Sequence, residues 1–367
     1  MQFLNRWFYR GIVLLFPAKE KPLPTNPRSI LIFSSTGIGD ALADSAAIES
    51  LHRAYPTAKI IVCTHHRRRS VVSHHPHVDE IIPLSKSPLS QLSLLKRFWR
   101  QSPDLVVGLH LNAEAVPLGY ILNRQAFIGS QDECSKMAFL LSHPVVTRDE
   151  PHIVKAGLKV AKRAGGLAVE VMSYQVKPEE VIALRQRLPE LTRIFHTHFN
   201  EGAARPYIVM QAGGGKTRAW RDWPVEDYIQ TIKWLEAHYA YRVVLTGGHD
   251  NREAGQAISA ACPNVINLVE QTTLEETAVL LDGATLLVST DTGVMHLGFA
   301  IGCPTLALLH YESPAAVCGP LDFSPGHEVI ELSRPTVAPA NHEKEMGKIP
   351  MNAVKEALVR MMREHAH

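Results

Sequence analysis

Short apolar runs alternate along the chain with longer segments in which apolar residues recur every three or four positions. The runs predict buried strands, and the periodic segments predict helices. In the first half the expected strands are 29–33, 59–63, 78–84, 104–109 and 126–128, and the expected helices are 40–55, 89–100 and 153–164. Strands alternating with helices predict a mostly parallel sheet with helices on both faces.

The same alternation restarts after a helix predicted at 178–188 and an irregular polar stretch at 189–206. Strands are expected at 207–211, 242–246, 265–268, 285–289 and 305–309, and helices at 224–238, 251–261, 274–281, 294–301 and 352–363. A chain of 367 residues exceeds one ordinary core. We therefore predict an α/β protein of two Rossmann-like, doubly wound domains that face a central cleft, where ligands of such sheets bind. The expected divisions are an extension at 1–27, a domain at 28–188, a linker at 189–206, a domain at 207–345 and a C-terminal helix at 346–367.

Composition narrows the class of protein. Hydrophobic residues make up 46% and charged residues 20%, which is typical of a globular protein, and a net charge of +2 predicts no nucleic-acid partner. The five cysteines are odd in number and include no C-x-x-C pair. This pattern argues against a disulfide framework or a structural zinc site, so we expect buried thiols in a cytoplasmic protein.

The first 17 residues combine Arg6 and Arg10 with Trp7, Phe8 and a short apolar run at 11–16. That run is too short to span a bilayer. Two interpretations remain open. The segment is either an interfacial helix on an anionic membrane surface or an extension packed on its own domain.

A glycine-containing turn, STGIGD, joins the first predicted strand to its helix. Gly37 and Gly39 permit a tight turn, which places Asp40 at the carboxyl end of the strand. The carboxylate is either a general base for an acceptor hydroxyl or a cap of its own helix. The spacing differs from the six-residue dinucleotide fingerprint, so no nicotinamide or other cofactor is expected.

A glycine-rich basic loop, QAGGGKTRAWRDWP, follows the first strand of the second domain. Gly213, Gly214, Lys216 and Arg221 would offer backbone N–H groups and positive charge to an anionic diphosphate. The alternative is a solvated basic loop.

The segment STDTGVMH ends a strand and begins a helix at once. Its Thr292, Gly293 and His296 would form a phosphate site at the helix N-terminus, with Asp291 beside them. The alternative is a capping aspartate and a core histidine.

A dense basic cluster, with His65, Arg67, Arg68 and Arg69, follows the second predicted strand. It would either receive an acidic acceptor or form a solvated loop. The histidine spacings fit metal ligands only loosely, so no metal site is predicted.

Several of these motifs together resemble one family. DTGVMHLGFAIGCPTLAL resembles the signature of the heptosyltransferases, glycosyltransferase family 9, and IGDALADSAAIESLHRAYPTAKI is similar to their N-terminal motif. RDWP, with Arg221 at the usual lysine position, LTGGHDN, with Gly247, and LEETAVLLDGATLLVSTDTG match further segments in order. The resemblance covers residues 29 to about 309.

The resemblance implies a GT-B fold and an inverting, metal-independent glycosyltransferase. It assigns Asp40 as the catalytic base. In the donor site it places Arg221 against the leaving nucleotide and Asp291, Thr292, Gly293 and His296 around the diphosphate. It implies ADP-heptose as donor, lipopolysaccharide core or a related acidic envelope glycan as acceptor, and a cytoplasmic location peripheral to the inner membrane.

The sequence also departs from the family pattern. Ser34 stands where the family often has lysine, and His310-Tyr311-Glu312 replaces a common Gly-Pro-Thr. Three alternatives therefore stay open: a protein-directed heptosyltransferase, a nucleotide-sugar epimerase, and a non-catalytic homologue that binds nucleotide-sugars or glycans.

Overall fold

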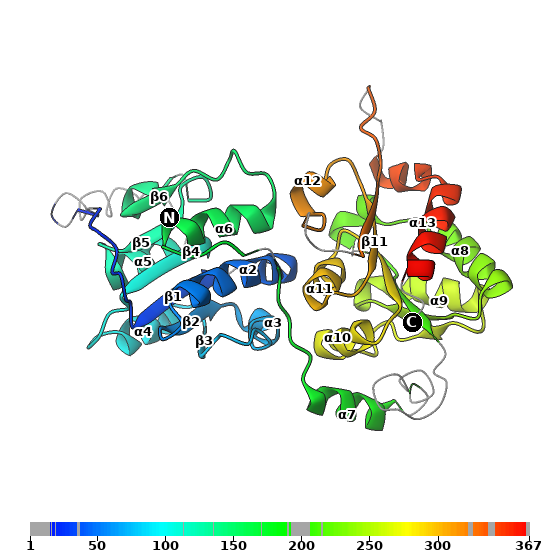
Figure 1. Ribbon diagram of the computed structural model, residues 1–367, viewed down its shortest axis with the longest axis horizontal. Helices are drawn as coiled ribbons and strands as arrows, with labels where there is room; N and C mark the ends of the chain where they lie inside the picture. Colours follow the sequence, from blue (N-terminus) through cyan, green and yellow to red (C-terminus); the bar gives the residue numbers. More distant parts are fainter. Residues whose placement is uncertain are drawn as a thin grey trace. The chain divides into compact units, whose positions relative to one another are not determined.

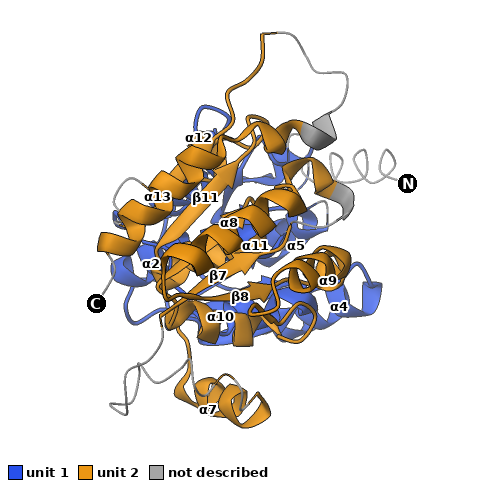
Figure 2. Cartoon of the chain, turned by 90° about the vertical axis from the view of Figure 1, so that its right-hand side faces the viewer, with its two compact units in different colours: residues 1–174 blue, residues 175–367 orange. Residues whose placement is uncertain are grey.

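The chain divides into two compact units, residues 1–174 and 175–367, which Figure 2 colours blue and orange. The computed structural model describes residues 15, 17, 18, 20–34, 37–112, 114–134, 136–169, 171–188, 191, 206–213, 216–321, 326–336 and 342–364. The segment 1–17, for which an interfacial helix and a packed extension were both possible, therefore lies almost entirely outside the described residues.

Unit 1 is built on a six-stranded parallel sheet in the order β3-β2-β1-β4-β5-β6 (Figure 1). Its strands are β1 (Ser29–Ser34), β2 (Lys59–Thr64), β3 (Glu80–Pro83), β4 (Leu105–His110), β5 (Phe127–Ser130) and β6 (His143–Val145). Its helices are α2 (Ile38–Ala54), α3 (Arg69–Val72), α4 (Pro88–Arg97), α5 (Ala115–Asn123) and α6 (Ile153–Arg163), with 3-10 turns η1 (His66–Arg68) and η2 (Ala138–Leu140).

Both faces of this sheet are covered, as the alternation of strands and helices predicts. On one face, Ile30 and Ile32 of β1 pack against α2 and α6. On the other face, Leu31 and Phe33 pack against α4 and α5. Successive strand residues point to opposite faces, so a strand buried on both sides must be apolar throughout. This explains the continuous apolar runs in the sequence.

Unit 2 repeats the architecture with the strand order β12-β11-β10-β7-β8-β9. Its strands are β7 (Tyr207–Gln211), β8 (Arg242–Thr246), β9 (Ile266–Asn267), β10 (Leu286–Thr290), β11 (Thr305–Leu309) and β12 (Glu328–Glu331). Its helices are α7 (Pro178–Arg187), α8 (Val225–His238), α9 (Arg252–Ala261), α10 (Leu274–Asp282), α11 (Gly293–Ile301), α12 (Ala315–Cys318) and α13 (Met351–Glu364), with 3-10 turns η5 (Lys216–Arg221), η6 (His249–Asn251) and η7 (His342–Lys348).

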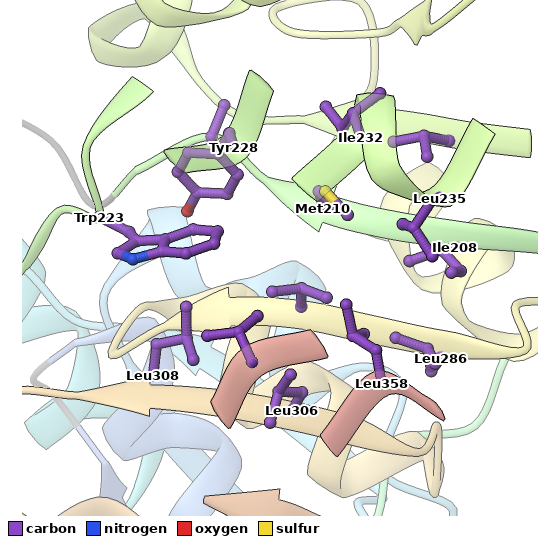
Figure 3. Close-up of a cluster of buried hydrophobic side chains, with 14 of the residues drawn as sticks. Ile208, Met210, Trp223, Tyr228, Ile232, Leu235, Leu286, Leu306, Leu308 and Leu358 are labelled. Carbon is purple, nitrogen blue, oxygen red and sulfur yellow. The ribbon is translucent and has the colours of Figure 1, made fainter. Parts of the chain in front are cut away.

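Figure 3 shows the core on one face of the unit 2 sheet. Tyr228 and Ile232 of α8 and Leu358 of α13 pack over Met210 and Leu308 of the strands. On the other face, the Tyr207 hydroxyl donates to the Leu280 carbonyl of α10 at 2.7 Å. The second doubly wound sheet is thereby confirmed.

Helix α7 belongs to unit 2 by its contacts. The Arg187 guanidinium donates to Glu276 of α10 at 2.7 and 2.8 Å and to the Gln271 carbonyl at 2.6 Å. The sequence pattern instead predicted that the first domain ends at 188, because the polar stretch that follows α7 is the more conspicuous break in the pattern. The two units divide earlier, between Tyr174 and Gln175.

Helix α5 and strands β6 and β12 were not predicted from the sequence pattern, and neither were the one-turn helices α3 and α12. Pro117 and Gly119 obscure α5, although a proline in the first turn of a helix breaks no hydrogen bond. Strands β6 and β12 lie at the edges of their sheets and contain Pro144 and two glutamates, which are common devices of edge strands.

All five cysteines are buried and free, which confirms the expectation of buried thiols. None of the helices within the described ranges has the length and apolar character needed to cross a bilayer.

Replacing Gly302 by alanine should lower the free energy of unfolding by about 1 kcal/mol. Gly302 ends α11 with φ 82°, a left-handed conformation that an L side chain adopts only at a cost, and an added Cβ would meet no atom within 4 Å. Chemical denaturation would measure the change. Gly248→Ala, at φ −88° and in open space, is the matched control and should leave stability unchanged or slightly raised. Equal effects of both replacements would contradict this explanation.

Candidate functional site

Asp40 lies in the first turn of α2, directly beyond the carboxyl end of β1. Its Oδ2 accepts a hydrogen bond from the Gly37 N–H at 2.7 Å. A Cβ at Gly37 would lie 2.9 Å from that oxygen, so glycine permits the close approach. The capping interpretation is thus confirmed, and the carboxylate remains half-buried rather than enclosed. A cap of this kind holds the side chain in one orientation at the sheet edge.

Asp44 and His110 form a buried ion pair at the same edge, and the sequence pattern did not predict it. His110 Nδ1 lies 2.9 Å from Asp44 Oδ1, and its Nε2 lies 4.0 Å from Glu133 Oε1. Asp44 is fully buried one helical turn after Asp40. The available signal was a charged residue inside the apolar face of α2, but its partner lies 66 positions away.

This cluster holds His110 as a cation. Burial alone would lower the pKa of His110, but the charge and hydrogen bond of Asp44, with Glu133 and Asp40 nearby, raise the pKa to about 10. A positive imidazolium therefore lies near Asp40 at neutral pH.

The free energy of unfolding should consequently fall as the pH rises from neutral to about 10. A histidine whose pKa is raised by folding contributes stability that is complete below its ordinary pKa and is lost above the folded value. His110→Gln removes the titrating group, so it should flatten that part of the profile relative to the unsubstituted protein. Denaturant unfolding between neutral pH and pH 10 would test this, and parallel profiles would contradict it.

The basic cluster follows β2, the neighbour of β1. Arg67 and Arg69 are exposed, whereas Arg68 and His65 are half-buried. The His65 Nδ1 accepts the Arg67 N–H at 3.3 Å, which caps η1. The three arginines and His65 therefore lie at the same edge of the sheet as Asp40.

In unit 2, Asp291 gathers three side chains around its carboxylate. Arg221 Nη1 lies 2.5 Å from Oδ2, His296 Nε2 lies 3.7 Å from Oδ1, and the Ser313 hydroxyl donates to Oδ2. Asp291 follows β10 and Arg221 ends the η5 turn after β7, and these strands are neighbours in the sheet. Burial alone would raise the pKa of Asp291, but His296, Ser313 and Arg221 together lower it to about 2.

The helix start at α11 is organised by Thr292 rather than by Asp291. Thr292 is the N-cap, and its Oγ1 accepts the Met295 N–H at 3.4 Å. Gly293 is the first residue of the helix, and His296 is buried beside Asp291. The reading of Asp291 as a helix cap is therefore wrong, because its carboxylate is directed to Arg221 and Ser313 instead.

The predicted glycines follow neighbouring strands. Gly213 adopts φ 117° after β7, where a Cβ would lie 3.1 Å from Asn251 Nδ2, and Gly247 follows β8. Gly214 lies outside the described residues, and Lys216 begins η5 with a side chain that is not among those described. Within the described ranges, no group of three or more His, Cys, Asp or Glu side chains is arranged to hold a metal ion.

Comparison with known proteins identifies the family of this chain. Residues 92–339 match the model of glycosyltransferase family 9 (heptosyltransferase). The chain belongs to that family. It is 26% identical to lipopolysaccharide heptosyltransferase 2 of Escherichia coli K12 over 313 residues, covering 81% of this chain and 84% of the relative. It is 23% identical to lipopolysaccharide heptosyltransferase 1 of Salmonella typhimurium over 304 residues, covering 79% and 90%.

Solved structures of other glycosyltransferases have the same fold as this chain. The family 9 glycosyltransferase of Veillonella parvula has a TM-score of 0.75 at 18% identity, with 93% of this chain and 98% of that chain covered. The E. coli ADP-heptose lipopolysaccharide heptosyltransferase II has a TM-score of 0.73 at 22% identity, with 92% and 100% covered. This family 9 member is therefore a glycosyltransferase with the predicted α/β fold of GT-B type.

Two positions at which this glycosyltransferase departs from the family pattern, Ser34 and His310, are both buried. Ser34 is buried at the end of β1. His310 is buried against Trp220, with ring centroids 4.7 Å apart, and Trp220 in turn lies under the Arg221 guanidinium at 4.7 Å. The replaced segment therefore supports the arginine that pairs with Asp291.

Proposed function

We propose that the protein transfers heptose from ADP-heptose to lipopolysaccharide core or a related envelope glycan, with inversion and without a metal ion. The single observation that carries the proposal is the buried cluster of Arg221, Asp291 and His296 at the start of α11. The similar proteins of E. coli and Salmonella typhimurium are lipopolysaccharide heptosyltransferases. The structure of an E. coli heptosyltransferase of the same fold was solved with ADP.

The cluster suits the departing diphosphate. Asp291 orients Arg221 and His296, which are its ion-pair partners, so these two groups are pre-arranged before a donor binds. Backbone N–H groups at the start of α11 add partial positive charge. Negative charge that develops on the diphosphate as the glycosidic bond breaks is stabilised there without reorganisation.

Asp40 suits the role of general base. Its Oδ2 is held by the Gly37 N–H, and its side chain is half-buried at the carboxyl edge of the sheet. It takes the proton of the acceptor hydroxyl as that oxygen attacks the anomeric carbon. A single displacement of this kind inverts the anomeric centre. The cations Arg67, Arg68 and Arg69, with His65 beside them, are suited to an acidic acceptor.

The decisive experiment follows ADP release from ADP-heptose by the purified protein, with deacylated lipopolysaccharide core as acceptor and EDTA present throughout. We expect release only with acceptor, and a product of inverted anomeric configuration by NMR. Release without acceptor would instead indicate an epimerase. A donor-induced rise in melting temperature without turnover on core or peptide acceptors would indicate a binding homologue.

The proposed location is the cytoplasm, at the inner face of the inner membrane, because a lipid-linked acceptor is presented there. Cell fractionation of the natural host would test it, and recovery in the periplasm would contradict it.

A further inference from the structure

Helix α4 of unit 1, labelled in Figure 1, carries large apolar side chains that are exposed rather than packed in the core. Trp99 and Leu89 are the two most exposed large apolar side chains of the described residues, at 85% and 78%, and Leu92 is 61% exposed. Isolated exposed leucines are ordinary on protein surfaces, but a group of them is not.

The two leucines and Lys96 form one stripe along the helix, and Trp99 lies just beyond its end. Leu89, Leu92 and Lys96 are spaced by three and four positions, which places them on one side of the helix. Trp99 and Arg100 follow directly after the last turn. The opposite side of α4 is accounted for, because Leu94 and Phe98 are buried in the core. The outer apolar residues therefore contribute nothing to the packing of unit 1.

Positive charge surrounds the stripe. Residues 81–103 contain Lys86, Lys96, Arg97 and Arg100 and no acidic residue. Arg97 is paired with Glu80 at 3.2 Å, and Lys86 lies 3.9 Å from Glu114. Lys96 and Arg100 form no ion pair with any described residue, and both are exposed. Leucines and a tryptophan flanked by unpaired cations are the composition of helices that lie in a membrane interface.

We propose that the outer face of α4, defined by Leu89, Leu92, Lys96, Trp99 and Arg100, docks unit 1 onto an anionic phospholipid surface. The apolar side chains enter the boundary between headgroups and acyl chains, and the two cations lie among the anionic headgroups. A second copy of the chain suits the face poorly, because a two-fold contact would bring its cations against their own copies. The proposal does not depend on the transferase activity.

The test is flotation of the full-length protein with vesicles of phosphatidylglycerol and phosphatidylcholine, compared with vesicles of phosphatidylcholine alone. We expect binding to the anionic vesicles that weakens as salt is added. Leu89→Ser/Leu92→Ser/Trp99→Ser and Lys96→Glu/Arg100→Glu should each lower the partition coefficient by about tenfold or more.

Matched controls alter exposed residues elsewhere. Leu167→Ser/Ile182→Ser removes two apolar side chains, each 53% exposed, and Lys233→Glu reverses an exposed charge on α8. Both should float like the unsubstituted protein. Transfer to a water-soluble acceptor should be unchanged in all α4 variants, which separates failed docking from failed catalysis.

Two results would overturn the proposal. One is undiminished flotation of both α4 variants. The other is an unsubstituted protein that ignores anionic vesicles, whether or not it forms an α4-dependent dimer by light scattering or captures an acidic protein.

Discussion

Asp40→Asn should lower the rate of sugar transfer by about 10²- to 10⁴-fold, the usual contribution of a general base. An amide cannot take the proton of the acceptor hydroxyl. The fold should persist, because the asparagine oxygen can still accept the Gly37 N–H hydrogen bond that Asp40 makes at 2.7 Å. Steady-state ADP release at saturating donor and acceptor, with unfolding measured in parallel, separates the two effects.

Asp132→Asn is the matched control for this replacement. The Asp132 Oδ2 accepts hydrogen bonds from the backbone N–H groups of Thr147 at 2.7 Å and Arg148 at 3.1 Å, so it too is a carboxylate of unit 1 held by the backbone. We expect it to keep full activity. Normal turnover by Asp40→Asn would remove this residue from the mechanism and leave it as a helix cap alone.

Arg221→Ala should lower kcat/KM by about 10²- to 10³-fold and the free energy of unfolding by about 3 kcal/mol. The first effect follows from the loss of a cation at the departing diphosphate. The second arises because Asp291, with a side chain only 8% exposed, loses its closest charged partner at 2.5 Å. Donor titration and denaturant unfolding of the same variant would measure both.

Three further variants sharpen this prediction. Arg218→Ala alters an exposed arginine of the same turn and should change neither quantity strongly. Arg221→Lys keeps the charge and should retain most of the activity. Arg221→Ala combined with Asp291→Asn should destabilise less than the sum of the single replacements, because the buried carboxylate is then neutral. Additive losses of stability would show that the two side chains act independently.

Much of the fold could be predicted from the sequence, because buried strands leave a clear apolar pattern. Strands buried on both faces must be apolar throughout, so β1, β2, β7, β8 and β11 appear as continuous runs with nearly the predicted bounds. Helix α5 and the edge strands β6 and β12 were missed because they are short or interrupted by proline, glycine or charge. Local sequence carries little signal for such elements.

Part of the candidate site could likewise be predicted from the sequence, and part could not. Asp40, Thr292 and Gly293 could be placed from the sequence, because a strand followed at once by a helix fixes where the connecting residues lie. Which side chains pair with them was decided by the tertiary structure. Asp44 meets His110 because β1 and β4 are neighbours, and Arg221 meets Asp291 because β7 and β10 are.

The sequence by itself thus determined the two sheets, the family and the positions of the site loops, since these follow from local apolar periodicity and short motifs. Only the tertiary structure decided the ion pairs, the assignment of α7 to unit 2 and the exposed outer face of α4. Those features depend on strand order and on which side of each helix is covered, and both arise from contacts between residues far apart in the chain.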